Sequence, residues 1–414
     1  MSRIDDLIAE LCPAGVPRKA LAEVGEFVRG GGLQKKDFVE EGFPCIHYGQ
    51  IYTFYGTSTT TTKSFVSPAL AATLKKAKPG DLVITTTSEN IGDVCTAVAW
   101  LGDEPIAIGG HSCVFRHTLD PMYVAYYFQT EQFEIQKRRF VTGTKVKDIK
   151  VADIGRIEIP VPPLAIQREI ASILDKMESL KAELEAELEL RSRQYAFYRD
   201  QLLDFRERAG VRWVPMGDLG TIFGGLTGKT KADFSNGNAR YVSYVNVFNN
   251  LAVDVERDDY VRVDPGERQR SLQVGDVVFT GSSESAADVA MSSAVTRVPD
   301  GPLYLNSFCI GFRPSQGALL DPDFSKHLFR SGPMRASLVR TASGVTRFNV
   351  SKARLAKVEV PIPALNEQRR IASVLDKFDT LVSDLSIGLP AEIAARQKQY
   401  EYYRDKLLTF EVAA

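Results

Sequence analysis

The sequence predicts an α+β fold built twice: a strand-rich α/β segment is followed by a long helix, and the same order then recurs. Three observations predict this. The chain of 414 residues contains an internal repeat. The first part of each copy alternates β-branched and aromatic residues in short runs, and the second part carries apolar residues at helical spacing. We therefore expect two α/β domains joined by two long antiparallel helices.

The composition excludes several classes of protein. Hydrophobic residues make up 44% of the chain and charged residues 25%, as in an ordinary globular protein. No apolar run reaches the roughly 18 residues of a membrane span, and the N-terminus, with Asp5 and Asp6, does not resemble a signal peptide. The five cysteines are scattered without a CxxC pair, which fits reduced thiols rather than disulfides or zinc ligands. We expect a cytoplasmic protein.

The repeat is clearest in two blocks. The first reads VPPLAIQREIASILDKMESL from Val161 and IPALNEQRRIASVLDKFDTL from Ile362, with 11 of 20 positions identical at an offset of 201 residues (362 − 161). The second reads QYAFYRDQLLDF from Gln194 and QYEYYRDKLLTF from Gln399, with 8 of 12 positions identical at an offset of 205 (399 − 194). The second copy therefore carries about one extra helical turn between the blocks.

The segments ahead of these blocks are expected to contain the sheets. Runs at 81–86, 276–280 and 241–248 predict strands, and 123–139 and 324–341 predict helices. The chain then divides into an N-terminal stretch (1–15), a first front segment (16–158), a central helical segment (159–210), a second front segment (211–359) and a distal helical segment (360–414).

Each helical segment carries a seam of apolar residues at steps of three and four, flanked by charge, as in a long helix that packs on another helix. Gly388 and Pro390 interrupt the second seam, so that helix should break and restart with proline in its first turn. Each helix could instead be the core helix of its own domain, but their length favours an antiparallel pair. The residues expected to pack the helices or to contact a partner are Ile170, Leu174, Met177, Leu184, Leu188, Tyr195, Ile371, Leu375, Phe378, Leu385, Tyr400 and Tyr403.

The formal net charge of −1 is unevenly distributed. Residues 16–158 carry 17 Lys and Arg against 16 Asp and Glu, and residues 211–360 carry 18 against 15. Residues 159–210 carry 8 against 10, and residues 361–414 carry 7 against 8. The front segments are mildly basic and the helices mildly acidic, so near-neutrality does not exclude a nucleic-acid partner.

Basic residues cluster at matching places in both front segments. Residues 325–358 hold eight cations and no acid, and the matching part of the first copy is also rich in lysine and arginine. A single cluster would be taken for a solvated surface, but its recurrence favours neutralisation of a phosphate backbone. Polar side chains in the strand loops can read base edges. The candidate DNA-binding residues are Lys35, Lys36, Tyr48, Gln50, Thr87, Ser88, Asn90, Arg138, Arg139, Lys145, Lys147, Lys229, Tyr244, Asn246, Ser282, Ser283, Arg335, Arg340, Arg347 and Asn349.

The sequence contains near matches to catalytic motifs, but each lacks a required residue. The stretch from Gly224 to Thr230 invites a P-loop interpretation, but GxxxxGK[ST] requires glycine where Phe223 stands, so a glycine-rich turn is the better account. His111 and Cys113 are close in sequence, but the histidines and cysteines show no metal-ligand spacing. No nucleophile elbow, HExxH or helix-opening GxGxxG occurs. We expect no catalytic residue, no metal site and no cofactor in this chain.

The repeated helical motifs resemble those of a known family. PLAIQREIASILDK and PALNEQRRIASVLDK, each preceded by IEIP or VEVP and followed by QYxxYRDxLL, are similar to motifs of the specificity subunits of type I restriction-modification systems. The resemblance covers essentially the whole chain, although the front segments match only in outline. It implies that the front segments are target-recognition domains in a pseudo-twofold arrangement, with the helices as an antiparallel, coiled-coil-like spacer.

The same resemblance implies partners. Each recognition domain would read one half of a bipartite, asymmetric target in double-stranded DNA, while the helices would set the spacer and dock two methyltransferase (M) subunits. These subunits would methylate adenine with S-adenosylmethionine, and motor-nuclease (R) subunits that use ATP and Mg²⁺ would join for cleavage. The chain itself would be non-catalytic and would contact no membrane.

Two other classes of function stay open at this point. The chain could be an adaptor, with two protein-binding modules on a coiled-coil spacer. DNA retention would then survive charge reversal at Arg335, Arg340 and Arg347. It could also be a self-contained nuclease or methyltransferase, which activity of the purified chain alone would reveal.

Overall fold

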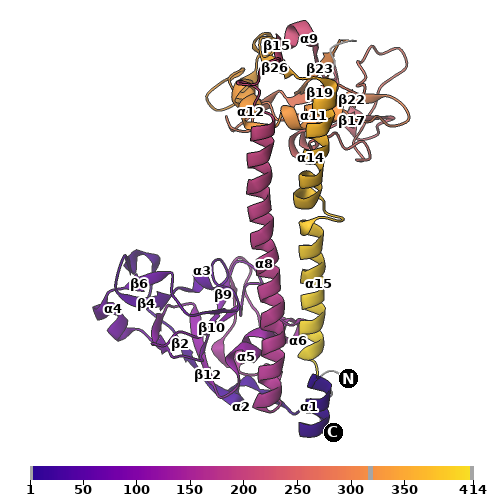
Figure 1. Cartoon of the computed structure of the whole chain (residues 1–414). Helices are drawn as coiled ribbons and strands as arrows, with labels where there is room; N and C mark the ends of the chain where they lie inside the picture. Colours follow the sequence, from indigo (N-terminus) through magenta and orange to yellow (C-terminus); the bar gives the residue numbers. More distant parts are fainter. Residues whose placement is uncertain (1–2, 316–319, 411–414) are drawn as a thin grey trace. The chain divides into compact units, whose positions relative to one another are not determined.

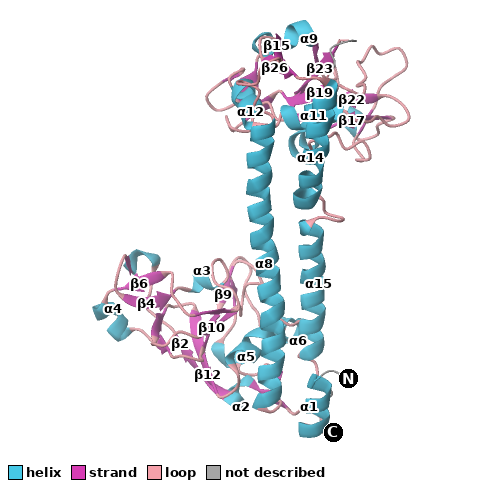
Figure 2. Cartoon of the chain, in the orientation of Figure 1, coloured by secondary structure: helices cyan, strands magenta, loops and turns pink. Residues whose placement is uncertain are grey.

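A computed structural model of the chain describes residues 3–315 and 320–410 and divides into two compact units (Figure 1). Unit 1 consists of Met1–Glu185 and Glu392–Ala414, and unit 2 consists of Ala186–Ala391. Each unit therefore holds one front segment with parts of both helical segments. Both units mix helices and strands, as Figure 2 shows, which confirms the expected α+β class. No helix within the described ranges is long and apolar enough to cross a membrane.

Unit 1 contains two five-stranded sheets. The first has the order β2 (Gly25–Arg29), β12 (Ser112–His117), β8 (Leu82–Thr85), β10 (Ala97–Trp100), β5 (Ser58–Thr59). The second has the order β3 (Phe38–Val39), β6 (Ser64–Val66), β4 (Phe43–Ile46), β11 (Ile106–Ile108), β7 (Lys76–Ala77). The strand predicted at 81–86 is β8, at the centre of the first sheet.

β8 is apolar from Leu82 to Ile84 because its two faces pack on different cores. Leu82 and Ile84 lie with Phe115 in the core that includes the start of the long helix. Val83 lies with Val98 in a second core on the other side. Successive side chains of a strand point to opposite faces, so a strand between two cores needs an unbroken apolar run.

The helices of unit 1 that surround these sheets are short. They are α1 (Arg3–Leu11), α2 (Leu21–Val24), the 3-10 helix η1 (Lys35–Asp37), α3 (Tyr48–Ile51), α4 (Pro68–Thr73), α5 (Pro121–Tyr127), α6 (Glu131–Arg138) and α7 (Val151–Ile154). The single helix predicted at 123–139 is therefore two, α5 and α6. The Thr130 hydroxyl accepts a hydrogen bond from the Phe133 amide at 3.2 Å, and this N-cap starts a new helix.

Unit 2 repeats the first sheet of unit 1 with four strands. Their order is β16 (Gly220–Gly224), β23 (Cys309–Pro314), β19 (Val277–Thr280), β21 (Ser292–Ala294). Unit 2 also has two three-stranded sheets, with the orders β18 (Tyr260–Val261), β17 (Ala239–Val242), β22 (Leu303–Leu305) and β20 (Ser282–Ser283), β25 (Phe348–Val350), β24 (Ala342–Ser343). The strand predicted at 276–280 is β19, which holds the place of β8.

The helices of unit 2 are α9 (Met216–Leu219), η2 (Lys231–Phe234), α10 (Tyr244–Asn249), α11 (Pro322–Leu328), α12 (Gly332–Val339) and α13 (Lys352–Leu355). The prediction of one helix at 324–341 is again replaced by two, α11 and α12. The strand predicted at 241–248 is wrong beyond Val242. The Ser243 hydroxyl accepts a hydrogen bond from the Asn246 amide at 3.4 Å, so a local cap outweighs the β-rich composition.

The helical segments differ in continuity. The central one forms α8 (Leu164–Leu202), a single helix of 39 residues, whereas the distal one forms α14 (Leu365–Ser383) and α15 (Leu389–Leu407). The predicted break is confirmed, because α15 restarts at Leu389 with Pro390 in its first turn. From 365 to 407 the distal span has 43 residues, four more than α8. This equals the difference between the repeat offsets, so the break holds the extra residues.

The helices pair inside each unit. In unit 1, α15 lies beside the first part of α8 and runs antiparallel to it (Figure 1), and the Tyr400 hydroxyl oxygen lies 3.2 Å from the Glu178 carboxylate. In unit 2, the last part of α8 lies beside α14, where the rings of Tyr198 and Phe378 are 5.9 Å apart. The expected pairing of the helical segments is therefore present in both units.

A two-stranded antiparallel ladder closes each front segment. β1 (Arg18–Ala20) pairs with β14 (Glu158–Pro160), and β15 (Arg212–Pro215) pairs with β26 (Glu359–Ile362). The first and last residues of each front segment thus lie side by side, directly before α8 or α14.

Candidate DNA interface

In unit 2, candidate residues from three separate segments meet where β19 ends. β20 pairs with β25, which places Ser282 opposite Asn349. The Arg347 guanidinium donates to the Ser282 hydroxyl at 3.1 Å, and the Tyr244 hydroxyl donates to the Ser282 carbonyl oxygen at 2.8 Å. We name this group cluster 2; its predicted members are Tyr244, Ser282, Ser283, Arg347 and Asn349.

Unit 1 gathers equivalent residues at the end of β8. β9 (Thr87–Ser88) pairs with β13 (Lys147–Asp148), so Lys147 lies opposite Ser88. The His111 carbonyl oxygen accepts a hydrogen bond from the Thr86 amide at 2.8 Å, and the His111 ring lies 5.1 Å from that of Tyr48. We name this group cluster 1; its predicted members are Tyr48, Thr87, Ser88 and Lys147.

A tight hairpin beside each cluster depends on glycine. Gly143 has φ +96 and Gly344 has φ +149, and a Cβ would lie 2.0 Å and 1.9 Å, respectively, from a carbonyl oxygen across the turn. The tips carry apolar side chains: Val146 is 58% exposed and Val345 is 92% exposed. Such tips, next to Lys147 and Arg347, suit contact with base edges, because thymine presents a methyl group in the major groove.

Each cluster contains one ring that the sequence did not single out as DNA-binding. Phe308 is 61% exposed, and the Arg347 guanidinium lies 5.8 Å from its ring centre. His111, at the equivalent place, is exposed and has φ +62. An exposed ring is suited to stacking on a base or sugar, and Phe308 also has the Arg347 cation beside it. Their position in the sequence could have identified both residues, because each directly precedes a Cys-containing strand that pairs with β8 or β19.

Several predicted cations lie on the surface outside the strand ladders that hold the clusters. The exposed ones are Lys35, Lys36, Arg138, Arg139, Lys145 and Arg340. Arg138 forms an ion pair with Glu134 at 3.0 Å, and surface pairs of this kind exchange readily with water and phosphate. Asn90, also exposed, donates to Asp93 at 3.2 Å.

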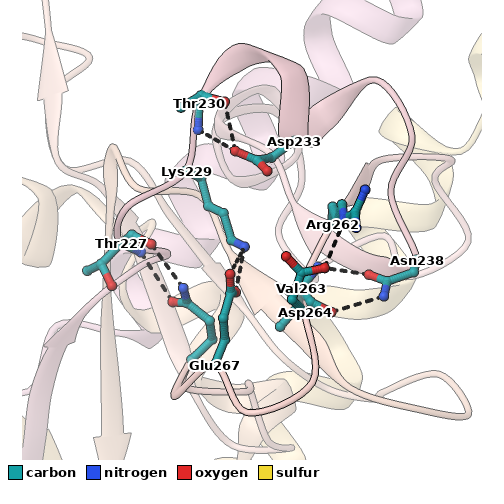
Figure 3. A network of polar contacts seen from close by, with 10 residues as sticks. Thr227, Lys229, Thr230, Asp233, Asn238, Arg262, Val263, Asp264 and Glu267 are labelled. Carbon is teal, nitrogen blue, oxygen red and sulfur yellow. Dashed lines mark hydrogen bonds and ion pairs between the residues drawn. The ribbon is translucent and has the colours of Figure 1, made fainter.

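Lys229 is neutralised inside unit 2. Its ammonium lies 2.8 Å from Glu267 Oε1, and its side chain is only 4% exposed (Figure 3). In the same loop the Asp233 carboxylate accepts from the amide and hydroxyl of Thr230 at 2.7 and 2.8 Å. The segment leads into the 3-10 helix η2 rather than a long α-helix, so it lacks the helix N-terminus that holds phosphate in a P-loop.

Arg335 and Lys137 hold the loops that follow β20 and β9. Arg335 donates to the carbonyl oxygens of Ala287 and Val289 at 2.8 and 2.7 Å. Lys137, which is 2% exposed, donates to the Val94 carbonyl oxygen at 3.0 Å. Arg335 therefore supports the loop next to cluster 2 from within the protein.

Two predicted amides are also engaged internally. Asn246 is 1% exposed; its side chain donates to the Asp254 carbonyl oxygen at 2.8 Å and accepts from the Asp254 amide at 3.0 Å. Gln50 accepts from the His47 amide at 3.1 Å and donates to the Ser64 hydroxyl at 2.7 Å. Both residues shape the loops beside the clusters, and their hydrogen-bonding groups point inward.

Most predicted helix-packing residues are shielded within their own unit. Those that are buried are Ile170, Leu174, Tyr195, Ile371, Leu375 and Tyr400. Those that are partly buried are Met177, Leu184, Leu188 and Phe378. Leu385 does not pack on a helix: it is 81% exposed in the break between α14 and α15. Tyr403 lies on the outer face of α15 and is 38% exposed.

A buried glutamine joins each front segment to its helix in the same way. Gln167 accepts a hydrogen bond from the Asp120 amide at 2.8 Å and donates to a proline carbonyl oxygen at 2.7 Å. Gln368 repeats both contacts, with the Asp321 amide and a proline carbonyl oxygen, each at 2.8 Å. The glutamine of the repeated helical motif therefore fixes how each domain sits on its own helix.

A second connection differs between the units. In unit 2 the buried His327 ring lies 3.1 Å from the Tyr195 hydroxyl and 2.6 Å from the Asp376 carboxylate. Burial alone would raise the pKa of Asp376, but hydrogen bonds from His327 and a neighbouring lysine lower it overall. In unit 1 Tyr126 takes the place of the histidine and donates to Asp175 at 2.6 Å.

Four buried cysteines have thiols with raised pKa values. Burial raises the pKa of Cys45, Cys95 and Cys309 to about 12 and also raises that of Cys113. These thiols are protonated at neutral pH and are poor nucleophiles. In the part of the chain that the structure describes, no group of three His, Cys, Asp or Glu residues could hold a metal ion.

Comparison with protein families matches both copies of the repeat. The type I restriction modification DNA specificity domain matches residues 13–190 and again residues 210–395. The chain belongs to the type I restriction-modification specificity-subunit family. As a specificity subunit it recognises DNA sequence and is not an enzyme, because catalysis resides in the other subunits of the system. The adaptor and self-contained-enzyme hypotheses are therefore set aside.

Individual relatives agree with this assignment. The Escherichia coli EcoR124I/EcoR124II type I restriction enzyme specificity subunit is 35% identical over 297 residues, which cover 70% of each chain. A solved chain from work on complex assembly and conformational transition of the type I R-M system has a TM-score of 0.66 at 18% identity, covering 95% of this chain and 97% of that one. The HsdS subunit from Thermoanaerobacter tengcongensis has a TM-score of 0.53 at 18% identity, covering 96% and 97%. These solved chains share the fold.

Proposed function

We propose that this specificity subunit recognises a bipartite, asymmetric target in double-stranded DNA, with one half-site for each front segment. One observation carries the proposal: clusters 1 and 2 hold the same place in two related folds but present different side chains. His111 in cluster 1 holds the position of Phe308 in cluster 2, and Lys147, opposite Ser88, holds the position of Phe348, opposite Ser283. Two domains that share a topology but present different side chains to DNA select different bases.

The helical segments set the unread spacer and dock two M subunits. α8 alone, at 39 residues, is roughly 58 Å long at 1.5 Å per residue. The helical blocks are alike at 11 of 20 positions, whereas the front segments match only in outline. This is the expected pattern if the helices serve a shared partner and the front segments serve different half-sites.

The chemistry belongs to the partners. The M subunits bind S-adenosylmethionine and methylate adenine, and R subunits that require ATP and Mg²⁺ join them for cleavage. This chain contributes no cofactor site, and it acts in the cytoplasm, where the DNA is accessible.

The test is to express the chain with its neighbouring methyltransferase and to map methylated adenines across the genome. We expect one asymmetric motif with two half-sites and a fixed spacer. Substituting Phe308 and Arg347 by Ala should relax only one half-site, and His111→Ala with Lys147→Ala should relax only the other. Absence of sequence-specific methylation, or a change of both half-sites by either variant, would contradict the proposal.

A further inference from the structure

The segments that follow β9 and β20 have the same backbone shape. Loop 1 runs from Ser88 to Cys95 and loop 2 from Ser283 to Ala290, with eight residues each at an offset of 195 (283 − 88). Both end in a buried residue with a left-handed backbone that is not glycine: Cys95 has φ +63 and Ala290 has φ +56. This conformation is unfavourable for a residue with a side chain, so the surrounding structure must hold it in place.

A cation on a neighbouring helix holds each loop from inside the protein. Lys137 donates to the carbonyl oxygens of Gly92 and Val94 at 3.2 and 3.0 Å. Arg335 donates to the carbonyl oxygens at the two equivalent positions of loop 2, at 2.8 and 2.7 Å. The cations themselves are not equivalent, because Lys137 is the seventh residue of α6 and Arg335 the fourth residue of α12. Different side chains thus make the same pair of contacts, which indicates that both units need this loop shape.

Four residues are identical in the two loops, and internal contacts account for three of them. They are Ser88, Glu89, Asp93 and Val94 in loop 1 and Ser283, Glu284, Asp288 and Val289 in loop 2. The serines pair with β13 and β25, and the valines are buried. Asp93 accepts a hydrogen bond from the Ser88 hydroxyl at 3.2 Å, and Asp288 stabilises the charge of Arg335. Only the glutamates are left without a structural role.

The two glutamates are exposed and unpaired. Among the residues that the structure describes, neither the Glu89 nor the Glu284 carboxylate forms a hydrogen bond or an ion pair. The two residues that follow each glutamate differ between the loops, Asn-Ile in loop 1 and Ser-Ala in loop 2. An unpaired carboxylate that is the same in both units, next to surface positions that differ, indicates a contact outside the chain.

The position and the charge of the glutamates narrow the kind of contact. Glu89 directly follows Ser88 of cluster 1, and Glu284 directly follows Ser283 of cluster 2. Phosphate repels a carboxylate, so these residues do not add to non-specific affinity for DNA. In the major groove a carboxylate can accept a hydrogen bond from N4 of cytosine or N6 of adenine, whereas guanine and thymine present acceptors there. Exocyclic amino groups are therefore the DNA groups that suit the two glutamates.

We propose that Glu89 and Glu284 are specificity-determining residues, each of which accepts a hydrogen bond from the exocyclic amino group of one cytosine or adenine in the half-site of its own unit. This rests on the proposed function, which supplies the DNA. Because the two loops share their shape and their carboxylate, both half-sites should carry an amino-bearing base at the same distance from their methylated adenine. Two front segments that otherwise differ then have one element of their targets in common.

The test expresses single variants of the full chain with the methyltransferase and maps methylated adenines across the genome. Glu89→Ala should relax one position of one half-site, so that guanine or thymine is accepted there. The preference for the amino-bearing base should fall about tenfold or more, and the other half-site should stay unchanged. Glu284→Ala should have the same effect in the other half-site. Circular dichroism checks that each variant folds.

Glutamine variants distinguish the two possible bases. Glutamine pairs with N6 and N7 of adenine, so in Glu89→Gln and Glu284→Gln a position that is read as cytosine should shift toward adenine. A position that is read as adenine should stay adenine. Either result supports the proposal and identifies the base.

Two other exposed carboxylates are the controls. Glu10 lies on α1 and Asp300 in the loop before β22, and these segments contribute no member to either cluster. Glu10→Ala and Asp300→Ala should leave the methylated motif unchanged. An unchanged motif in the folded alanine variants of Glu89 and Glu284, or an equal change of methylation at all sites with no relaxed position, would overturn the inference. Absence of sequence-specific methylation by the unchanged chain would contradict the proposed function instead.

Discussion

At the scale of single residues, the two buried glutamines show how one side chain can fix the orientation of a domain on its helix. Gln167 and Gln368 each satisfy a backbone amide and a backbone carbonyl that are otherwise shut off from water. A buried polar group without a partner is costly, so each glutamine stabilises one orientation of its front segment over others.

Gln167→Ala and Gln368→Ala should each lower the free energy of unfolding by about 1–3 kcal/mol, because each leaves a buried amide and a buried carbonyl unpaired. Denaturant titration followed by circular dichroism measures the change. Gln201→Ala, at an exposed position of α8, is the control and should change stability by less than about 0.5 kcal/mol. An equal effect of all three variants would refute this role of the glutamines.

The buried His117 leads to a prediction of how the free energy of unfolding depends on pH. Burial lowers the pKa of His117 from 6.5 to about 4. Between these values the unfolded chain binds the proton and the folded chain does not, so the free energy of unfolding should fall as pH falls from 6.5 to 4. The slope from this residue is at most about 1.4 kcal/mol per pH unit. His117→Phe should flatten the profile in that window, and an unchanged slope would show that other groups cause it.

At the scale of elements, the glycine hairpins have a backbone conformation that other residues adopt poorly. Gly344→Val should distort the hairpin beside cluster 2, because Gly344 has φ +149 and a Cβ there lies 1.9 Å from the Arg347 carbonyl oxygen. We expect binding to the specific target to weaken about tenfold or more while non-specific binding persists. Gly56→Val is the control, because Gly56 has no positive φ and no atom lies within 4 Å of its Cβ. If both variants weaken binding to the specific target equally, the hairpin beside cluster 2 has no particular role in target binding.

Because α8 is continuous, its length should determine the length of the DNA spacer between the two half-sites. Inserting one helical turn of four residues within 183–189 should change the length of the spacer between the half-sites and leave both half-sites intact. Genome-wide mapping of methylated adenines in cells that express the variant with its methyltransferase gives the answer. If the half-sites change and the spacer does not, α8 does not act as a ruler.

Elements whose signals are local could be predicted from the sequence, and those that depend on distant partners could not. The break at Gly388 and the central strand β8 follow from spacing and composition. The helix α10 was missed because a cap at Ser243 competes with β-rich composition. Lys229 could not be separated from surface cations, since its partner Glu267 lies 38 residues away.

At the scale of the whole molecule, the main surprise is that each unit is assembled from distant parts of the chain. Unit 1 needs α15: the Tyr400 hydroxyl donates to Gln129 at 3.0 Å, and Asp405 accepts from the Glu131 amide at the start of α6 at 3.2 Å. Unit 2 uses the last part of α8 in the same manner, with Asp200 accepting from the Gly332 amide at 2.9 Å. The duplication was evident in the sequence, but this exchange of helical parts was not, since it depends on contacts between residues far apart.

Truncation after residue 391 should therefore destabilise unit 1 although it removes only residues far from the first front segment. We expect faster hydrogen exchange in β8 and α5, and unchanged exchange in β19 and α11, because the removed residues pack in the core of unit 1. Mass-spectrometric exchange on the full chain and the truncated chain compares them. Uniform protection of both units in the truncated chain would show that α15 contributes no stability.

The ladders that close the front segments have a consequence for inheritance. Because β1 pairs with β14 and β15 pairs with β26, the first and last residues of each front segment are adjacent in the fold. A gene that acquires a foreign stretch between the codons of one such strand pair would keep both helices in register. If each front segment reads one half-site, as proposed, recombination at these two strand pairs replaces one half of the DNA target in a single step, while the surfaces of the repeated helices stay the same.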